Sequence, residues 1–255
     1  MKRNLFLLSE LVRRDLAVRY AGSFGGAAWA LLNPLLLCGL YSLVFSVIVR
    51  IPPPEDFRGT YAEFLLAGLL PWLGFQDALV RGGSAVTDQA HLVRKMSFPV
   101  ALLVVASVAS ALVLQAAGLG VFAIASGAFG SAQLRVLPLL AGFALELLLL
   151  AGPALALAAA SVLFRDLAQL IPPLMTVAFY LTPVLYPEAL VPAALRWGLE
   201  ANPLRDVVGL FRAGLIGAEA PPPTRVALWM ALSGVLAFFG YRFFTRSRRL
   251  FADVL

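Results

Sequence analysis

The sequence predicts an all-α integral membrane protein with six transmembrane helices preceded by an amphipathic interface helix, and with short re-entrant or interfacial helices on the outer side before the last span. The first observation is composition: 61% of the 255 residues are hydrophobic and only 13% are charged. The second is that the apolar residues gather into six runs, each near the roughly 20 residues that a helix needs to cross a bilayer. Backbone polar groups in lipid must be satisfied within the chain, so these runs are expected to be helical. The predicted spans are residues 29–49, 61–79, 99–125, 136–164, 167–186 and 226–244 of a single domain, 1–255.

The amphipathic helix is predicted over residues 4–20. Its apolar face is formed by Leu5, Leu8, Val12 and Leu16, and its polar face by Ser9, Glu10, Arg13 and Arg14. A helix of this kind lies in the cytoplasmic interface with its basic face toward lipid headgroups or a partner. Two roles remain open for it, a membrane-surface anchor alone or a contact for another protein.

The connections between spans differ in length and composition. Residues 51–60 contain three prolines and join the first two spans as a short outer hairpin. Residues 81–98 are expected to be a cytoplasmic loop with a helical stretch, Thr87–Met96, because Pro99 stops or redirects a helix. In the long outer segment, Pro192–Leu199 and Pro203–Ile216 are too short to cross and are predicted to be the re-entrant or interfacial helices.

The distribution of positive charge predicts the orientation of the chain. On a six-span topology, 13 of the 20 lysine and arginine residues lie on the side of the two termini and seven lie on the other side. Cytoplasmic loops carry the excess of Lys and Arg, so both termini are predicted to be cytoplasmic. The net charge of +6 follows from these topology charges, and no nucleic-acid partner is expected.

Catalytic chemistry is not supported by the sequence. No G-x-x-x-x-G-K-[ST] phosphate loop is present, no Cys/His/carboxylate cluster has metal-ligand spacing, and no serine lies in a G-x-S-x-G turn. Neither a catalytic residue nor a metal site is therefore predicted.

Glu146 falls near the middle of the fourth span, where a carboxylate costs on the order of 2.5–3.5 kcal/mol, so it should face protein or water. It is either a helix-packing group or a proton relay.

Six blocks of the chain resemble, in order, those of ABC-2 type permeases that export polysaccharides, including O-antigen and teichoic acid. The first is residues 13–41, which run basic, Asp, hydrophobic, any residue, Arg, Tyr, then Gly-Ser, then Trp and Pro-Leu-Leu. The others are LLAGLLPWLGFQDAL at 65–79, HLVRKMSFP at 91–99, FRDLAQLI at 164–171, YLTPVLYP at 180–187 and NPLRDVVGLFR at 202–212. The resemblance covers nearly the whole chain.

The resemblance implies the transmembrane subunit of a polysaccharide or O-antigen ABC exporter in the bacterial cytoplasmic (inner) membrane. Such a subunit forms a homodimer, binds two ATP-binding subunits and moves lipid-linked polysaccharide. ATP and magnesium belong to the ATP-binding subunits, and no cofactor is expected in this chain. The alternative within the superfamily is an ABC-2 type permease for a drug or lipid substrate. A membrane enzyme is the third reading, for which the sequence offers no polar catalytic cluster.

The resemblance also implies contacts with the ATP-binding motor subunit. Carried over onto this sequence, the motor-coupling residues are Arg13, Arg14, Asp15, Arg19, Tyr20, Asp88, His91, Leu92, Arg94, Lys95, Arg165 and Asp166. For Arg94 and Lys95, a role as topology charges alone is the competing interpretation.

Two further sites concern the glycan itself. Guanidinium groups suit phosphate oxygens, so a pyrophosphate headgroup site is suggested at Arg14, Arg19 and Arg94. Aromatic rings can stack on the apolar faces of sugars, and a glycan-lining path is suggested for Tyr41, Phe45, Trp72, Phe75, Phe179, Tyr180 and Tyr186. Ordinary helix packing or the interfacial aromatic belt is the competing explanation for each of these rings.

Overall fold

The computed structural model of the protein describes residues 2–19, 26–51, 57, 59–95, 99–128, 133–164 and 166–251. Within these ranges the regular elements are all helices, which confirms the predicted all-α class. They are α1 (Lys2–Arg19), α2 (Trp29–Ser42), α3 (Tyr61–Asp88), α4 (Ala90–Lys95), α5 (Ala101–Ala128), α6 (Val136–Leu163), α7 (Leu167–Leu181), α8 (Arg196–Glu200), α9 (Pro203–Ile216) and α10 (Pro223–Ser247), with short 3-10 turns between some of them. A π-helix, Leu43–Ile48, continues α2.

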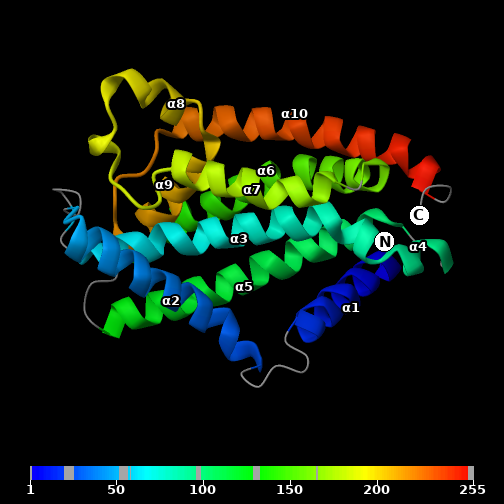
Figure 1. Cartoon of the computed structure of the whole chain (residues 1–255), viewed down its shortest axis with the longest axis horizontal. Coiled ribbons are helices and arrows are strands. Elements are labelled where there is room, and N and C mark those ends of the chain that lie inside the picture. The colour runs from blue at the N-terminus through cyan, green and yellow to red at the C-terminus, as the bar shows by residue number, and fades with distance from the viewer. Residues whose placement is uncertain are drawn as a thin grey trace.

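Four of these helices are long and apolar enough to cross a membrane, namely α3, α5, α6 and α10. Two shorter apolar helices, Leu32–Ile48 and Leu167–Leu181, coincide with the first and fifth predicted spans. The long helices run along the long axis of the molecule, and both ends of the chain lie at the same end of the bundle (Figure 1). This arrangement agrees with an even number of crossings.

Helix α3 is the centre of the bundle and packs against α5, α6, α7 and α9. A capping box begins it, since the Thr60 hydroxyl accepts from the Glu63 amide and the Glu63 carboxylate accepts from the Thr60 amide at 2.7 Å. The predicted span, 61–79, is too short, because the helix continues to Asp88. The glycines at 82 and 83 look like loop residues, yet they let side chains of α5, α6 and α7 approach the helix closely. The predicted loop at 81–98 therefore begins inside a buried helix.

Other boundaries also differ from the prediction. The stretch Thr87–Met96 is not one helix, because α3 ends at Asp88 and α4 starts at Ala90 after a turn. The fifth span was expected to reach residue 186, but α7 ends at Leu181 and an irregular, mostly buried segment follows. The expected helix Pro192–Leu199 is instead a 3-10 turn, Ala193–Leu195, followed by the short α8.

The second short helix has the predicted bounds, since α9 runs from Pro203 to Ile216. Helix α9 begins with Pro203, and the Asn202 side chain accepts from the Leu204 amide at 3.0 Å. It ends at Gly217, whose left-handed φ of 69° suits glycine. Because α9 packs against both α6 and α3, it is buried within the outer half of the bundle and does not lie on its surface.

Helix α10 packs on α6 through glycines. A Cβ placed on Gly152 would collide with the Leu236 carbonyl, and one placed on Gly240 would lie 2.7 Å from the Gly152 Cα. Small residues of this kind let helices approach closely in membranes. The remaining surface of α10 is apolar and exposed, as expected for a face toward lipid.

Candidate translocation path and cytoplasmic contact sites

The predicted motor-contact sites begin with α1, which lies against α5 near the end of the bundle that holds both termini (Figure 1). Arg13 and Arg14 are exposed, so their guanidinium groups are accessible to a partner or a headgroup. Asp15 and Arg19 differ, because both are largely buried and form ion pairs with α3. The predicted apolar face is only partly confirmed, since Leu8, Val12 and Leu16 are half-buried while Leu5 is exposed.

Several other predicted motor-contact residues lie at the same end. Asp88 is exposed and accepts a hydrogen bond from the Ser84 hydroxyl at 2.7 Å. On α4, His91 is exposed and Leu92 is half-buried, while only the helical backbone is described for Arg94 and Lys95. Asp166 is exposed just before α7. Tyr20 and Arg165 lie outside the described residues.

The aromatic residues predicted for the path come together across three helices. The Tyr41 ring centroid lies 6.3 Å from that of Phe45 and 5.9 Å from that of Phe179. The Phe179 ring also contacts Trp72 and Tyr180, each at 5.4 Å between centroids, and Trp72 contacts Phe75 at 6.4 Å. We call these six residues, Tyr41, Phe45, Trp72, Phe75, Phe179 and Tyr180, the aromatic seam.

The rings of the aromatic seam differ in exposure, and we call the buried rings inner and the more exposed rings outer. The inner rings, Trp72, Phe75 and Phe179, are buried, and Trp72 is only 2% exposed. Tyr180 is 56% exposed, and Tyr41 and Phe45 are half-buried. The seventh predicted residue, Tyr186, donates from its hydroxyl to the Tyr180 carbonyl at 2.8 Å. In this conformation the inner rings pack the bundle, and only the outer rings present a surface to a sugar.

The irregular segment after α7 is held by a buried arginine. The Arg212 guanidinium is 7% exposed and donates to the carbonyls of Pro183 and Val184, each at 2.7 Å. It lies 3.7 Å from the centroid of the Phe64 ring, and the Tyr61 hydroxyl donates to the Leu185 carbonyl at 2.5 Å. Three consecutive carbonyls are thus satisfied by side chains. Non-helical backbone at membrane depth requires such partners.

Glu146 is fully buried and pairs with the neighbouring helix. The Gln115 amide on α5 donates to the Glu146 Oε2 at 2.7 Å. The pair lies against Gly74 of α3, where any added side chain would collide with Gln115. This contact fits the helix-packing interpretation of Glu146.

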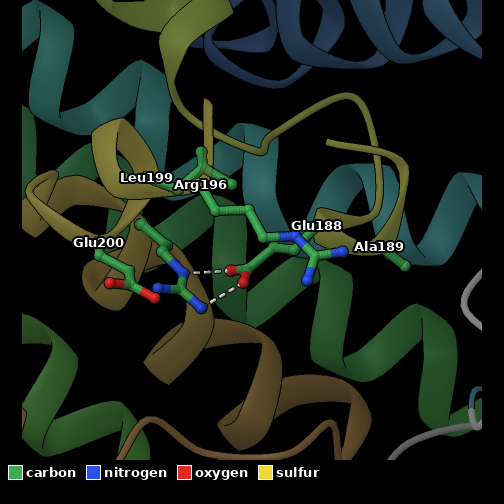
Figure 2. A pocket seen from close by; sticks show the side chains of 6 residues that line it. Glu188, Ala189, Arg196, Leu199 and Glu200 are labelled. Carbon is green, nitrogen blue, oxygen red and sulfur yellow. Dashed lines mark hydrogen bonds and ion pairs between the residues drawn. The ribbon is translucent and has the colours of Figure 1, made fainter. Parts of the chain in front are cut away.

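The outer segment contains a small polar cavity of about 300 Å³. Figure 2 shows its lining, in which the Glu188 carboxylate forms a two-point ion pair with Arg205. That hydrogen bond raises the pKa of the Arg205 guanidinium. The other lining residues are Ala189, Arg196, Leu199 and Glu200. All of them come from the outer segment, and none belongs to the aromatic seam.

A second outer ion pair joins α9 to α10. The Asp206 Oδ2 accepts from the Arg225 Nε and from the Trp229 indole, each at 2.8 Å. Burial raises the pKa of the Asp206 carboxyl, and the Arg225 guanidinium acts in the opposite direction. These contacts fix the outer helices to the start of the last span.

Sequence reasoning missed the most connected charged residues. It counted Arg212 as an outer topology charge, although the apolar residues on both sides of it in α9 were a signal that it is buried. It also counted Arg81 only as a topology charge on the side of the termini and gave no role to Gln115, and the partners of both residues are far away in the sequence. Among the described residues, no group of three or more His, Cys, Asp or Glu is placed to hold a metal ion.

The comparisons with known proteins agree with this architecture. The model of the family described as ABC-2 type transporter matches residues 7–216. The chain is 31% identical over 252 residues to the O-antigen export system permease protein RfbA of Myxococcus xanthus, covering 97% of this chain and 94% of that protein. It is 25% identical over 267 residues to the protein of the same name from Klebsiella pneumoniae, covering 100% of this chain and 98% of that protein.

A helical bundle in which four helices are long and apolar enough to cross a membrane is that of a multi-pass membrane protein. The match over most of its length is more specific, and the chain belongs to the ABC-2 type transporter family.

Proposed function

We propose that this protein is the channel-forming transmembrane subunit of an ATP-driven exporter, and that it moves lipid-linked polysaccharide, such as O-antigen or a related glycan, across the cytoplasmic membrane. The observation that carries the proposal is similarity over nearly the whole length of a relative named as an O-antigen export permease. Each of the six apolar runs contains a helix, four of them long enough to span, and a six-span topology with both termini in the cytoplasm is compatible with this bundle.

Energy for transport comes from a separate chain in this proposal. The sequence contains no phosphate-binding loop, so two ATP-binding subunits with their ATP and magnesium would bind at the cytoplasmic end. The exposed residues there, the charged Arg13 and Arg14 and the polar His91, offer contacts that give pairing specificity.

The path for the glycan is proposed along the aromatic seam. One chain alone leaves Tyr180 and the half-buried Tyr41 and Phe45 on an open apolar surface of α2 and α7. A second copy facing this surface would enclose the rings, which supports a homodimer. Stacking of sugars on aromatic rings lets a chain slide, because no single contact holds it.

A drug or lipid exporter is the other candidate within the family. The names of the relatives do not favour it, and a small substrate would not require aromatic rings on three helices.

Co-purification tests the assembly. When the tagged protein is produced together with a candidate ATP-binding subunit from the same genome, we expect a complex of two copies of each chain by mass measurement. Reversal of the exposed Arg13 and Arg14 charges should weaken that complex. Recovery of the permease alone under the same conditions would contradict the proposed assembly.

A further inference from the structure

Four charged side chains join α1 to α3, and we call Asp15, Arg19, Asp77 and Arg81 the charge clamp. The Arg19 Nη1 lies 2.7 Å from the Asp77 Oδ2, and the Arg81 Nη2 pairs with the Asp15 Oδ1. Within α1, the Arg19 Nη2 lies 3.8 Å from the Asp15 Oδ2. Each carboxylate therefore has a guanidinium partner on the other helix.

The spacing of the charge clamp is regular on both helices. Asp15 and Arg19 are four residues apart on α1, and Asp77 and Arg81 are four residues apart on α3, so each pair lies on one helix face. The partners run in opposite order along the two helices, which makes α1 antiparallel to α3 at this point. The backbone of α1 packs on α5, so the long charged side chains provide the link to α3.

Burial and charge balance indicate a structural joint. The Asp15 and Arg19 side chains are only 16% and 14% exposed, while Asp77 and Arg81 are about one third exposed. Two positive and two negative groups leave no net charge to attract a pyrophosphate. In a partly buried site, reversal of one charge leaves its partners uncompensated, which is costly.

Helix α3 connects the charge clamp to the aromatic seam. Trp72 and Phe75 lie within two turns of Asp77 on the same helix, and the Trp72 indole donates to the Gln76 side chain at 3.0 Å. A displacement of α3 at Asp77 therefore acts on Trp72, whose ring contacts Phe179 of α7, and Phe179 in turn contacts Tyr41 of α2.

We propose that the charge clamp carries the displacement of α1 to α3, which makes Asp77 and Arg81 positioning residues for transport. This inference rests on the proposed function. It places Asp15 and Arg19 inside the permease as transmitting groups, while Arg13 and Arg14 remain available to the motor subunit.

Charge reversal tests the proposal in proteoliposomes that contain the permease and its ATP-binding subunit. The readout is the amount of lipid-linked glycan transported per ATP hydrolysed. The single change Asp77→Arg should lower this ratio by about tenfold, a size typical of coupling between contacting charged residues. The fourfold inversion Asp15→Arg, Arg19→Asp, Asp77→Arg and Arg81→Asp restores every ion pair and should return the ratio to near the wild-type value.

Glu219→Arg is the matched control, because it reverses an exposed acidic residue between α9 and α10, away from the charge clamp and the motor contacts, and should leave the ratio unchanged. A fourfold inversion that assembles but stays as uncoupled as Asp77→Arg would overturn the proposal, as would an Asp77→Arg variant with wild-type coupling. If Asp77→Arg does not fold, recovery of folding and transport by the fourfold inversion still supports the clamp, and failure of both overturns it.

A separate readout distinguishes failure of the proposed charge clamp from failure of the proposed transport substrate. If the wild-type complex hydrolyses ATP without moving glycan, the proposed substrate fails. The clamp is then measured by the ATP-driven change in distance between spin labels at residues 10 and 102, on α1 and α5. Because the charge clamp holds α1 on α3, Asp77→Arg should enlarge the ATP-driven change in distance between the two labels. An unaltered distance change would overturn the proposed role of the charge clamp.

Discussion

Arg212 shows how one side chain fixes a membrane protein at a place where secondary structure stops. After Leu181 the chain leaves the helix, and its carbonyls at 183 and 184 need donors. A guanidinium supplies two parallel N–H groups, which a single ammonium does not. Gly68 leaves room for the guanidinium, since an added Cβ there would lie 2.7 Å from the Arg212 Nη2.

Arg212→Lys should destabilise the protein while keeping the buried charge. We expect the free energy of unfolding in detergent to fall by about 1–3 kcal/mol, the cost of a buried polar group without its hydrogen bond. Arg205→Lys is the control, because that ion pair is more exposed and should cost roughly 0–1 kcal/mol. Equal stability of the Arg212→Lys variant and the wild type would show that the guanidinium fork does not hold the segment.

Glu146 offers a test of proton coupling. Its Oε2 only accepts a hydrogen bond from Gln115, and a glutamine oxygen can do the same. We therefore expect Glu146→Gln to retain export, whereas Glu146→Leu should lose about 1–3 kcal/mol because the Gln115 amide is left without an acceptor. Loss of transport in a folded Glu146→Gln variant would instead indicate a proton relay.

At the scale of elements, α6 and α10 can pack closely because the glycines at their contact have no side chain. Gly152→Ala should push the two backbones apart and lower the free energy of unfolding by about 1–3 kcal/mol, the usual cost of overpacking. Gly234→Ala on α10 is the matched control. It has no heavy atom within 4 Å of an added Cβ, and alanine should be neutral or stabilise the helix by up to about 1 kcal/mol. Thermal unfolding of both variants in the same detergent distinguishes the two effects, and equal melting temperatures would contradict the close packing.

The starts of helices were predictable where either an apolar run or a capping residue marks them. The start of α9 followed from Asn202 and Pro203, and the starts of α3, α6 and α7 followed from the apolar runs. The end of α3 was not predictable, because Arg81 and two glycines resemble a loop until their partners on α1, α5 and α6 are known. The end of α7 was also missed, although Pro183 is a local signal, because a proline disfavours helical backbone at the preceding residue and Thr182 is extended. The distant Arg212 then holds the segment that follows.

The candidate site was predictable in its chemistry and only partly in its geometry. Six of the seven aromatic residues contact one another, and their role in lining a path stays a prediction. The sequence did not show that Trp72 and Phe179 are buried while Tyr180 is exposed. Asp15 and Arg19 were expected at a surface for a partner, and the structure pairs them with α3. Such pairings connect residues about 60 positions apart, so local patterns carry no sign of them.

For the whole molecule, the central claim is a helical conduit that opens only when a separate ATP-consuming subunit acts on it. The most direct measurement is uptake of radiolabelled lipid-linked polysaccharide into sealed inverted vesicles that contain this protein with or without its ATP-binding subunit. We predict ATP-dependent uptake with both chains and none with the permease alone. Equal uptake by the permease alone, or none with both chains and ATP, would contradict the account.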